Sequence, residues 1–397
     1  MRLRIRQALK AGVLAALAGL SLSAADWPQY LGPNRDGSSP EVPAQLPAKK
    51  ELWRKPLGAT EVHAGIAVAG GLVVVPDHQG DNDLVRCFKA DTGDVVWTHS
   101  SENQAEMEYG NAARATPAIL GDVVCTFSAV GEIYGLDLAT GKVLWKVDCE
   151  QNLKASLPEW GFCATPLIAD GKFIVSPAGP ALVALDPKTG KVAWQIKGGG
   201  SAYASFITAN LGGVMQIVGY DGADIAGWDL ATHKLLWSAT PENQGDFNVG
   251  TPVRVGDKLL YATDNNFARL FAFDAGGKLR EPAVATSEDL KPDMATPIFY
   301  KEAIYGGSDA FVCLDPADLK TLWSNDKLGG FSNLIAGNDR IMIFDDGGKL
   351  TLIAANKEKC EVLGEMKLCA KTWASPALAD GRLFIRDEKF IYCYAMK

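Results

Sequence analysis

Tryptophans recur in this chain at a fixed distance behind a polar residue, and this repeat restricts the fold more than any other feature. A spacing of eight joins Lys89 to Trp97, Asp137 to Trp145, Asp186 to Trp194, Asp229 to Trp237 and Asp315 to Trp323. Three of these windows contain Thr-Gly, at 92–93, 140–141 and 189–190. A β run, a glycine turn and a second β run that ends in tryptophan are typical of a tight hairpin. The chain is therefore predicted to repeat a two-stranded unit.

A second recurring pair precedes each hairpin. It is Thr-Pro or Ser-Pro, followed by an apolar run, a turn and another apolar run, at Thr116-Pro117, Thr165-Pro166, Thr251-Pro252, Thr296-Pro297 and Ser375-Pro376. Each repeat should then hold four strands over roughly 40 to 49 residues, which is the period of propeller blades.

The hairpins number eight. They fall at residues 84–97, 132–145, 181–194, 224–237, 269–280, 310–323, 350–362 and 390–397. The last repeat stops after its third strand, and Glu51 to Arg54 has the pattern of the missing outer strand. We therefore predict an all-β, eight-bladed propeller of four-stranded antiparallel blades, closed by pairing the N-terminal strand with the last blade, because this closure removes the free sheet edge.

Small residues occupy one aligned position, two places before the aspartate of the repeat. They are Cys87, Gly135, Ala184, Gly227, Ala272 and Cys313, with Ala354 and Cys393 as the expected equivalents in blades seven and eight. A small side chain here suits close packing between neighbouring sheets.

The first 25 residues have the pattern of a secretory signal peptide. Basic residues precede the apolar run from Ala11 to Leu20, and small residues follow, so cleavage is expected after Ala25 with Ser23 at the minus-three position. The run is too short to span a bilayer. No cysteine lies near this point, so no lipid anchor is expected. We predict a signal peptide at 1–25, an N-terminal arm at 26–50, the propeller at 51–397, and export to the periplasm or the cell exterior.

The charge balance is acidic, with 39 basic against 47 acidic residues. A nucleic-acid partner is therefore not expected, because there is no basic excess to meet phosphates.

The repeat Asp-x-x-Thr-Gly-x-x-x-Trp resembles the tryptophan-docking motif of pyrroloquinoline-quinone-like (PQQ-like) propellers, over residues 51–397. The resemblance implies eight blades and a structural docking role for Trp53, Trp97, Trp145, Trp194, Trp237 and Trp323. This superfamily includes quinoprotein alcohol dehydrogenases and the cofactor-free propeller subunit of the outer-membrane β-barrel assembly machinery. Residues 27–37 are similar to an N-terminal signature of secreted members.

The dehydrogenases of that superfamily use adjacent cysteines against the quinone, a calcium or lanthanide ion and an aspartate base. This chain has no two adjacent cysteines and no Cys-x-x-Cys-His. We therefore predict no catalytic residue and no cofactor. The alternative is a PQQ-dependent oxidoreductase, with PQQ and calcium at the mouth of the central channel.

Two tryptophans outside the repeat, Trp160 and Trp373, precede Thr-Pro or Ser-Pro pairs, where the chain should enter the innermost strand. Polar and aromatic residues at comparable places complete a candidate ligand site at one channel mouth: His63, Arg114, Tyr203, Asn248, Asp293 and Asn333. Propeller mouths are the usual concave sites of this architecture. The alternative is a hydrated funnel.

An acidic cluster at Asp77, His78, Asp81, Asn82 and Asp83 invites a calcium site. Because Asp and Asn are favoured in turns for their local hydrogen bonds, we expect a solvated turn instead, and no metal site.

Eight cysteines in an exported protein raise the question of disulfides. Cys149 with Cys163, and Cys360 with Cys369, are the candidate pairs. Cys87, Cys125, Cys313 and Cys393 are expected to be buried thiols.

These observations favour a monomeric exported scaffold that binds another exported or outer-membrane protein. The connections 102–113, 150–158 and 241–248 are long and polar, and therefore suited to contacts.

Overall fold

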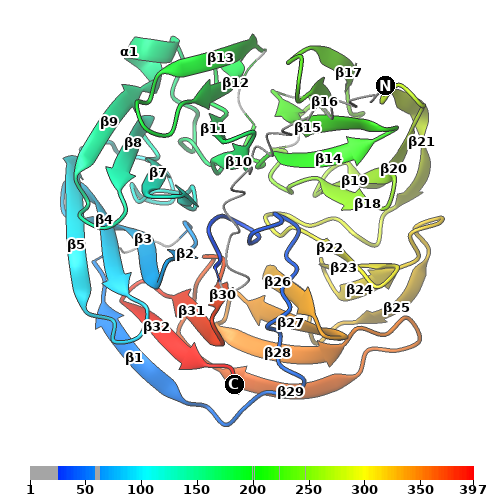
Figure 1. Ribbon diagram of the computed structural model, residues 1–397. Coiled ribbons are helices and arrows are strands. Elements are labelled where there is room, and N and C mark those ends of the chain that lie inside the picture. Colours follow the sequence, from blue (N-terminus) through cyan, green and yellow to red (C-terminus); the bar gives the residue numbers. More distant parts are fainter. Residues whose placement is uncertain (1–25, 59–62, 199, 201, 223, 246) are drawn as a thin grey trace, which may run out of the picture.

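The computed structural model describes residues 26–58, 63–198, 200, 202–222, 224–245 and 247–397. In these residues, eight four-stranded antiparallel sheets stand around a central axis (Figure 1). The predicted all-β, eight-bladed propeller is therefore confirmed. The predicted signal peptide lies outside the described residues and stays a prediction.

Blades are numbered in chain order, and the strands of each blade are given from the axis outward. Blade 1 holds β2 (Ala67–Ala69), β3 (Leu72–Gln79), β4 (Asn82–Lys89) and β5 (Val95–Glu102). Blade 2 holds β6 (Ala118–Leu120), β7 (Val123–Phe127), β8 (Glu132–Asp137) and β9 (Val143–Asp148). Blade 3 follows the short helix α1 (Cys149–Leu153) and holds β10 (Leu167–Ala169), β11 (Lys172–Val175), β12 (Pro180–Leu185) and β13 (Val192–Lys197). Blade 4 holds β14 (Ile207–Leu211), β15 (Val214–Asp221), β16 (Asp224–Asp229) and β17 (Leu235–Ala239).

The remaining blades continue the same order. Blade 5 holds β18 (Val253–Val255), β19 (Lys258–Thr263), β20 (Phe267–Phe273) and β21 (Leu279–Ser287). Blade 6 holds β22 (Ile298–Tyr300), β23 (Ala303–Gly307), β24 (Phe311–Leu314) and β25 (Thr321–Asn325). Blade 7 holds β26 (Ser332–Gly337), β27 (Arg340–Asp345), β28 (Lys349–Ala354) and β29 (Val362–Lys367). Blade 8 holds β30 (Ala377–Ala379), β31 (Arg382–Arg386), β32 (Phe390–Ala395) and β1 (Glu51–Pro56).

Strand β1 supplies the outer strand of blade 8, as the sequence predicts. It pairs antiparallel with β32, and Trp53 lies opposite Cys393. The ring is therefore closed by hydrogen bonds between the two ends of the propeller, and every blade has four strands.

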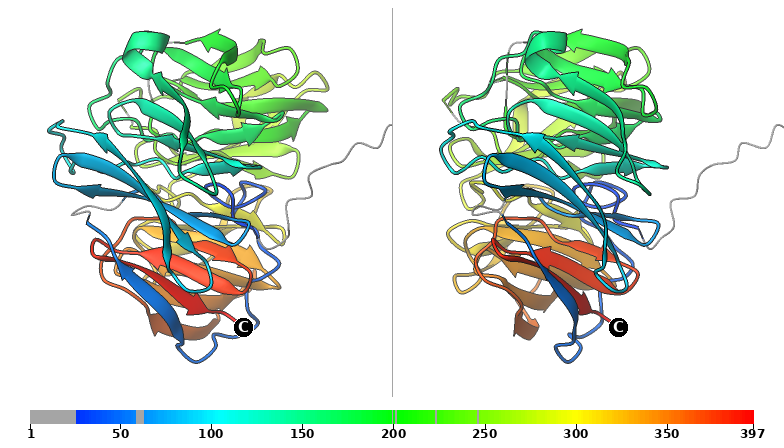
Figure 2. Two further views of the ribbon diagram at one scale, coloured as in Figure 1. Left: turned by 60° about the vertical axis from the view of Figure 1, so that its left-hand side comes forward. Right: turned by 90° about the vertical axis from the view of Figure 1, so that its left-hand side faces the viewer.

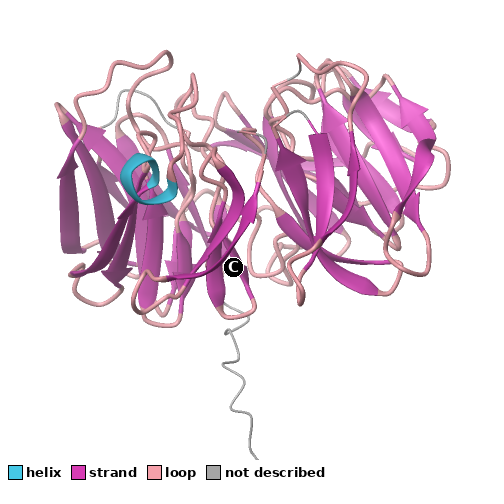
Figure 3. Ribbon diagram, turned by 90° about the horizontal axis from the view of Figure 1, so that it is seen from above, coloured by secondary structure: helices cyan, strands magenta, loops and turns pink. Residues whose placement is uncertain are grey.

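The antiparallel order of four strands places the turns on two opposite faces. The connections from one blade to the next share a face with the turns between second and third strands. Figure 3 shows the ring edge-on, with the longer loops gathered along one side. We call this side the mouth face.

The repeat tryptophans join neighbouring blades. The indole Nε1 of Trp97 donates to the Leu138 carbonyl oxygen of blade 2 at 2.8 Å, and that of Trp145 donates to the Pro187 oxygen of blade 3 at 2.7 Å. Gly141 has φ +71, and a Cβ built on it would lie 2.5 Å from the Trp97 ring. The glycine of the Thr-Gly turn is therefore required both by its backbone conformation and by the indole that covers it.

Other blades vary this contact. The Trp194 ring stacks on His233 at a centroid distance of 4.2 Å, where the imidazole occupies the place of the turn glycine at φ +59. The Trp237 indole donates to Gln216 of its own blade, and Gln216 donates to the Gly277 oxygen of blade 5 at 2.7 Å. The Trp53 and Trp323 indoles donate to Ala90 and Asn356.

Blade 7 departs from the repeat, and one prediction for it is wrong. Leu352 lies opposite Gly364, in the position where Gly135 lies opposite Trp145 in blade 2. Ala354 instead takes the place of the turn aspartate. The large and small residues have exchanged strands, and Leu46 of the N-terminal arm covers Gly364 where a tryptophan would otherwise lie.

The arm, residues 26–50, crosses the ring on the face opposite the mouth (Figure 2). Trp27 pairs with Val68 of blade 1, and the Pro28 oxygen accepts from the Ile119 amide of blade 2 at 2.8 Å. Ser39 then bonds to Ala336 of blade 7 at 2.8 Å. A single segment thus contacts blades on both sides of the axis.

All eight cysteines are free thiols, so both candidate disulfide pairs are contradicted. The Sγ of Cys163 is directed to the Trp160 carbonyl oxygen, and Cys360 accepts from the Asn325 amide. Cys149 and Cys369 are buried in separate apolar clusters. The two cysteines of each predicted pair therefore have different contacts. Cys87, Cys125, Cys313 and Cys393 are buried, as expected.

Within the described part of the chain, no helix has the length and apolar character needed to cross a bilayer.

Candidate site at the mouth of the propeller

A cavity of about 550 Å³ opens at the axis on the mouth face. Its wall comes from the connections that enter the innermost strands, so every blade contributes to it. Aromatic and hydroxyl side chains dominate the lining: Tyr30, Tyr109, Trp160, Tyr203, Phe247, Phe331, Trp373, Thr116, Thr165, Ser205, Thr251 and Ser375, among others.

Seven of the eight residues proposed from the sequence line this one cavity: His63, Arg114, Trp160, Tyr203, Asp293, Asn333 and Trp373. The eighth, Asn248, is buried beside it between two lining residues, Phe247 and Val249. Its carbonyl oxygen accepts from the Ala204 amide at 2.8 Å, which ties the connection before blade 5 to that before blade 4. The ligand role of all eight stays a proposal.

One side of the cavity is an aromatic wall, defined as Tyr109, Trp160, Tyr203 and Phe247. The Trp160 ring lies at its centre, 4.4 Å from the Phe247 centroid, 5.1 Å from Tyr203 and 6.5 Å from Tyr109. Phe247 and Tyr109 are 49% and 50% exposed. A guest in the cavity would therefore meet ring faces and edges that already extend to the surface.

Next to Tyr109 the lining continues with His63 and Trp373, whose ring centroids are 5.1 Å apart. Burial, with the charge of Arg114 as a smaller cause, lowers the pKa of His63 to about 4. The imidazole is therefore neutral at pH 7, and it contacts the Tyr109 carbonyl oxygen at 3.1 Å. The Lys371 ammonium lies 4.9 Å from the Trp373 ring centroid, within the range of a cation–π contact.

Arg114 fixes the two connections that carry Tyr109 and Trp160 of the aromatic wall. Its guanidinium donates to the carbonyl oxygens of Trp160 at 2.8 Å, Ala112 at 2.5 Å, Gly110 at 2.8 Å and Glu108 at 3.1 Å. Four carbonyl oxygens thus surround this buried cation. Its evident role is to position the backbone around Tyr109 and Trp160.

The N-terminal arm forms the floor of the cavity. The Tyr30 hydroxyl lies 3.0 Å from the Thr296 Oγ1, and Arg35 is 5% exposed below the channel. Arg35 donates to Phe206 O at 2.5 Å, Pro166 O at 2.9 Å, and both Thr165 O and Oγ1 at 3.0 and 2.6 Å. Burial lowers its pKa to about 9. Tyr30 of the arm thus lines the cavity, and Arg35 fixes the arm to blades 3 and 4.

Hydroxyl groups link successive blades around the cavity. The amide of Thr165 donates to Ser205 Oγ at 3.0 Å, that of Ser205 to Thr251 Oγ1 at 3.3 Å, and that of Thr251 to Thr296 Oγ1 at 3.3 Å. Two of these acceptors, Thr251 and Thr296, belong to the recurrent Thr-Pro pairs. The three hydrogen bonds join blades 3 to 6 in series beside the cavity.

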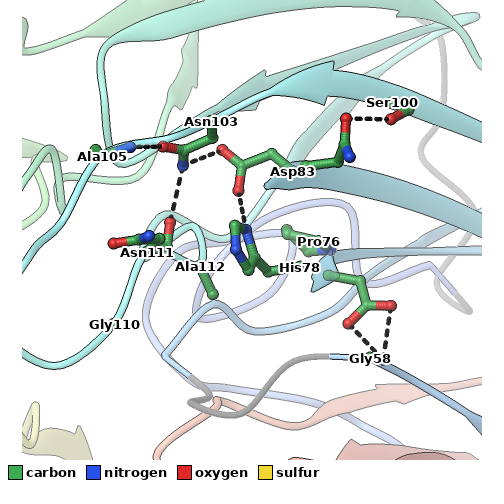
Figure 4. A network of polar contacts seen from close by, with 12 residues as sticks. Gly58, Pro76, His78, Asp83, Ser100, Asn103, Ala105, Gly110, Asn111 and Ala112 are labelled. Atoms are coloured by element: carbon green, nitrogen blue, oxygen red, sulfur yellow. Dashed lines mark hydrogen bonds and ion pairs between the residues drawn. The ribbon is translucent and has the colours of Figure 1, made fainter. Parts of the chain in front are cut away.

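A buried polar network anchors the connection that presents Tyr109 (Figure 4). The Asp83 carboxylate contacts His78 Nδ1 at 2.9 Å and accepts from the Asn103 amide at 2.9 Å. Asn103 also donates to the Asn111 carbonyl oxygen at 3.1 Å. Burial is the main cause that raises the pKa of Asp83.

The expected solvated turn is therefore wrong for two of its residues. Asp83 is 8% exposed and Asp77 is 1% exposed. Asp77 accepts from the Gly58 amide at 3.0 Å and from Arg86 Nε at 2.7 Å. These aspartates hold neighbouring connections in place. Asp81 and Asn82 are exposed, as a turn requires.

The residues that sequence reasoning missed include Tyr30, Tyr109, Phe247 and Phe331 in the lining, and Arg35 in the arm beneath it. Tyr109 and Phe247 lie in connections that were judged by their overall polarity, and an isolated aromatic residue in each was the signal available. Arg35 bonds mainly to backbone oxygens of distant blades, and such acceptors leave no pattern in a sequence.

The cavity lining does not fit a calcium-bound quinone. Among its described residues, Asp293 is the one carboxylate, and the described part of the chain has no group of three or more His, Cys, Asp or Glu placed to hold a metal ion. The sequence also has no adjacent cysteines.

A family model described as outer membrane protein assembly factor BamB matches residues 45–108 and 81–325. The chain therefore belongs to this family of PQQ-like propellers, as the tryptophan repeat predicts.

Individual relatives point in two directions. An outer membrane protein assembly factor BamB of Shewanella oneidensis is 21% identical over 77% of this chain and 77% of its own length. A lanthanide-dependent methanol dehydrogenase of Methylorubrum extorquens is 30% identical, over 38% of this chain and 26% of its own length. The structure of a europium-containing methanol dehydrogenase superposes with a TM-score of 0.70 at 14% identity, covering 94% of this chain and 98% of that one. That superposition supports the fold alone.

Proposed function

We propose that this chain is an exported, monomeric propeller that binds another exported or outer-membrane protein through its mouth face and acts as a scaffold, without catalysis of its own. Relatives named as outer membrane protein assembly factors support this proposal.

The observation that carries it is a set of three exposed apolar side chains on the connections of the mouth face, two of which line the cavity. Tyr109, Leu157 and Phe247 are 50%, 53% and 49% exposed, and they come from three different connections of the same face. Large apolar groups around a concave site are typical of a surface that a partner covers. These are also the three connections that the sequence singled out for contacts.

Site-specific photo-cross-linking tests the proposal in cells that make the protein. A photoreactive phenylalanine replaces Leu157 in one variant and Leu235 in a control, because Leu235 is equally exposed at 55% but begins an outer strand away from the mouth. We expect a discrete cross-linked protein from position 157 and none from position 235. Cross-links of equal yield from both positions would contradict the proposal.

A second candidate function is that of a PQQ-dependent oxidoreductase, which the aromatic walls of the axial cavity favour. The lining argues against this function, because Asp293 is the one carboxylate among its described residues. Titration of the purified chain with PQQ, with and without calcium, followed by tryptophan fluorescence, separates the two. We expect no saturable change, whereas calcium-dependent binding near one equivalent would favour the oxidoreductase.

A further inference from the structure

The mouth face has an acidic rim. Its connections carry the exposed carboxylates Glu106, Glu108, Glu150, Glu159, Glu242, Glu288, Asp289 and Asp293. On the turns of the other face, exposed carboxylates such as Asp91, Asp94 and Asp318 stand among exposed lysines such as Lys142, Lys191, Lys234 and Lys320. Because opposite charges steer and orient encounters, the acidic rim favours a cationic partner at the mouth.

Some of these carboxylates have partners within the chain. Glu242 lies 3.2 Å from Arg269, and Glu108 accepts from the Trp160 indole at 3.2 Å. Both are exposed, so their charge still acts on the solvent around the cavity. The Glu108 bond also couples the acidic rim directly to the centre of the aromatic wall.

The aromatic wall suits a cation. Indole, phenol and benzene faces attract an ammonium or guanidinium within about 6 Å of the ring centroid. Trp160 stands among three other rings at centroid distances of 4.4 to 6.5 Å. Lys371 already places its ammonium 4.9 Å from the Trp373 ring.

Lys371 is an exposed cation on the Trp373 side of the cavity, whereas the positive and titratable groups near the aromatic wall do not oppose such a guest strongly. The Arg114 guanidinium is directed into four carbonyl oxygens of its own connection and of Trp160. His63 is neutral at pH 7, because its pKa is lowered to about 4. Asp293 adds a carboxylate to the lining.

We infer that the mouth recognises an extended basic segment of its protein partner, with one arginine or lysine side chain lying against the aromatic wall and further basic residues on the acidic rim. This inference rests on the proposed function and names the chemistry of the partner.

Three labelled twelve-residue peptides of Gly and Ser test it, bearing four Arg, four Gln or four Glu respectively. Their affinities for the purified mature chain are measured by fluorescence anisotropy at low and physiological salt. We expect the arginine peptide to bind at least tenfold more tightly than the other two, and less tightly at the higher salt concentration. Equal affinity of the arginine and glutamine peptides, or no binding of the arginine peptide, would overturn the inference.

Two pairs of variants distinguish recognition at the mouth from general attraction to an acidic protein. Phe247→Ser removes a half-exposed ring of the wall, and Leu235→Ser is its control. Glu106→Gln with Glu159→Gln removes rim charge, and Asp91→Asn with Asp94→Asn removes as much charge from an exposed turn on the other face. We expect about a fivefold to tenfold loss for each mouth variant, on the scale of one such contact. Equal losses in a variant and its control would overturn the inference.

The result also separates the inference from the proposed function. If Leu157 cross-links a partner while the arginine peptide does not bind, the mouth binds proteins by other chemistry and the inference alone fails. If the cross-linking also fails, the proposed function fails with it.

Discussion

At the scale of single residues, the fold depends on turn glycines on which an indole ring from the neighbouring blade packs. Gly141 and Gly121 both have positive φ, +71 and +62. An added Cβ at Gly141 would lie 2.5 Å from the Trp97 ring, whereas one at Gly121 would meet nothing within 4 Å. The pair therefore separates backbone strain from the loss of the interblade contact.

We predict that Gly141→Ala lowers the free energy of unfolding by about 3 kcal/mol, since overpacking adds to strain, and that Gly121→Ala lowers it by about 1 kcal/mol. Urea unfolding of both variants measures the difference. Equal losses would show that the tryptophan contact does not constrain the turn.

His63 gives the cavity a defined pH dependence. Its pKa is lowered from 6.5 to about 4 in the folded chain, mainly by burial. Between these values the unfolded chain binds a proton that the folded chain does not, so stability falls as the pH falls. We predict that the stability of wild type relative to His63→Gln decreases by about 3 kcal/mol from pH 7 to pH 4. Chemical unfolding at several pH values tests this, and a constant difference would contradict it.

The same scale shows what the sequence could predict. Asp, Thr and Gly form the turn through local bonds, such as the 2.6 Å bond from Thr140 Oγ1 to Asp137, so the motif defines the hairpin register. Blade 7 lacks this motif, so nothing in its sequence indicated the register of the hairpin. The small residue was therefore predicted at Ala354, whereas the structure pairs Leu352 with Gly364.

At the scale of elements, the site depends on how the connections are anchored. The connection from β5 to β6 carries Tyr109 and Arg114, and Asn103 at its start bonds to both Asp83 and Asn111. The sequence predicted that these connections meet at the axis, because Thr-Pro or Ser-Pro pairs mark the entry to five of the innermost strands. It could not predict the buried aspartates, because Asp is equally common in exposed turns.

We predict that Asn103→Ala raises hydrogen exchange in residues 104–113 at least tenfold and costs about 2 kcal/mol, because the buried Asp83 carboxylate and the Asn111 carbonyl oxygen both lose the Asn103 amide as a donor. Asn82→Ala, at an exposed position of the same hairpin, is the control. Unchanged exchange in both variants would show that other contacts hold this connection.

At the scale of the whole molecule, the arm links distant blades of the ring. Arg35 satisfies the carbonyl oxygens of Thr165, Pro166 and Phe206 from blades 3 and 4. The ring closure and blade count were predictable from the period of the repeat. The path of the arm was not, since it follows backbone acceptors spread over distant blades.

We predict that Arg35→Leu lowers the free energy of unfolding by about 3 kcal/mol, because several buried carbonyl oxygens lose their donor. Arg254→Leu, an exposed arginine on the same side of the ring, should change it by less than about 0.5 kcal/mol. Thermal and urea unfolding measure both. An Arg35→Leu variant as stable as wild type would mean that the bonds from Arg35 to blades 3 and 4 do not stabilise the fold.

The most direct test of the central claim, that the mouth face binds a macromolecular partner, is affinity capture from the native extracellular or envelope fraction with three forms of the chain. These are wild type, Tyr109→Ser with Phe247→Ser at the mouth, and Val95→Ser with Leu235→Ser as equally exposed controls. We predict one protein retained by wild type and by the control but reduced at least tenfold by the mouth variant, as expected when hot-spot side chains are removed. Equal retention by all three forms would contradict the account.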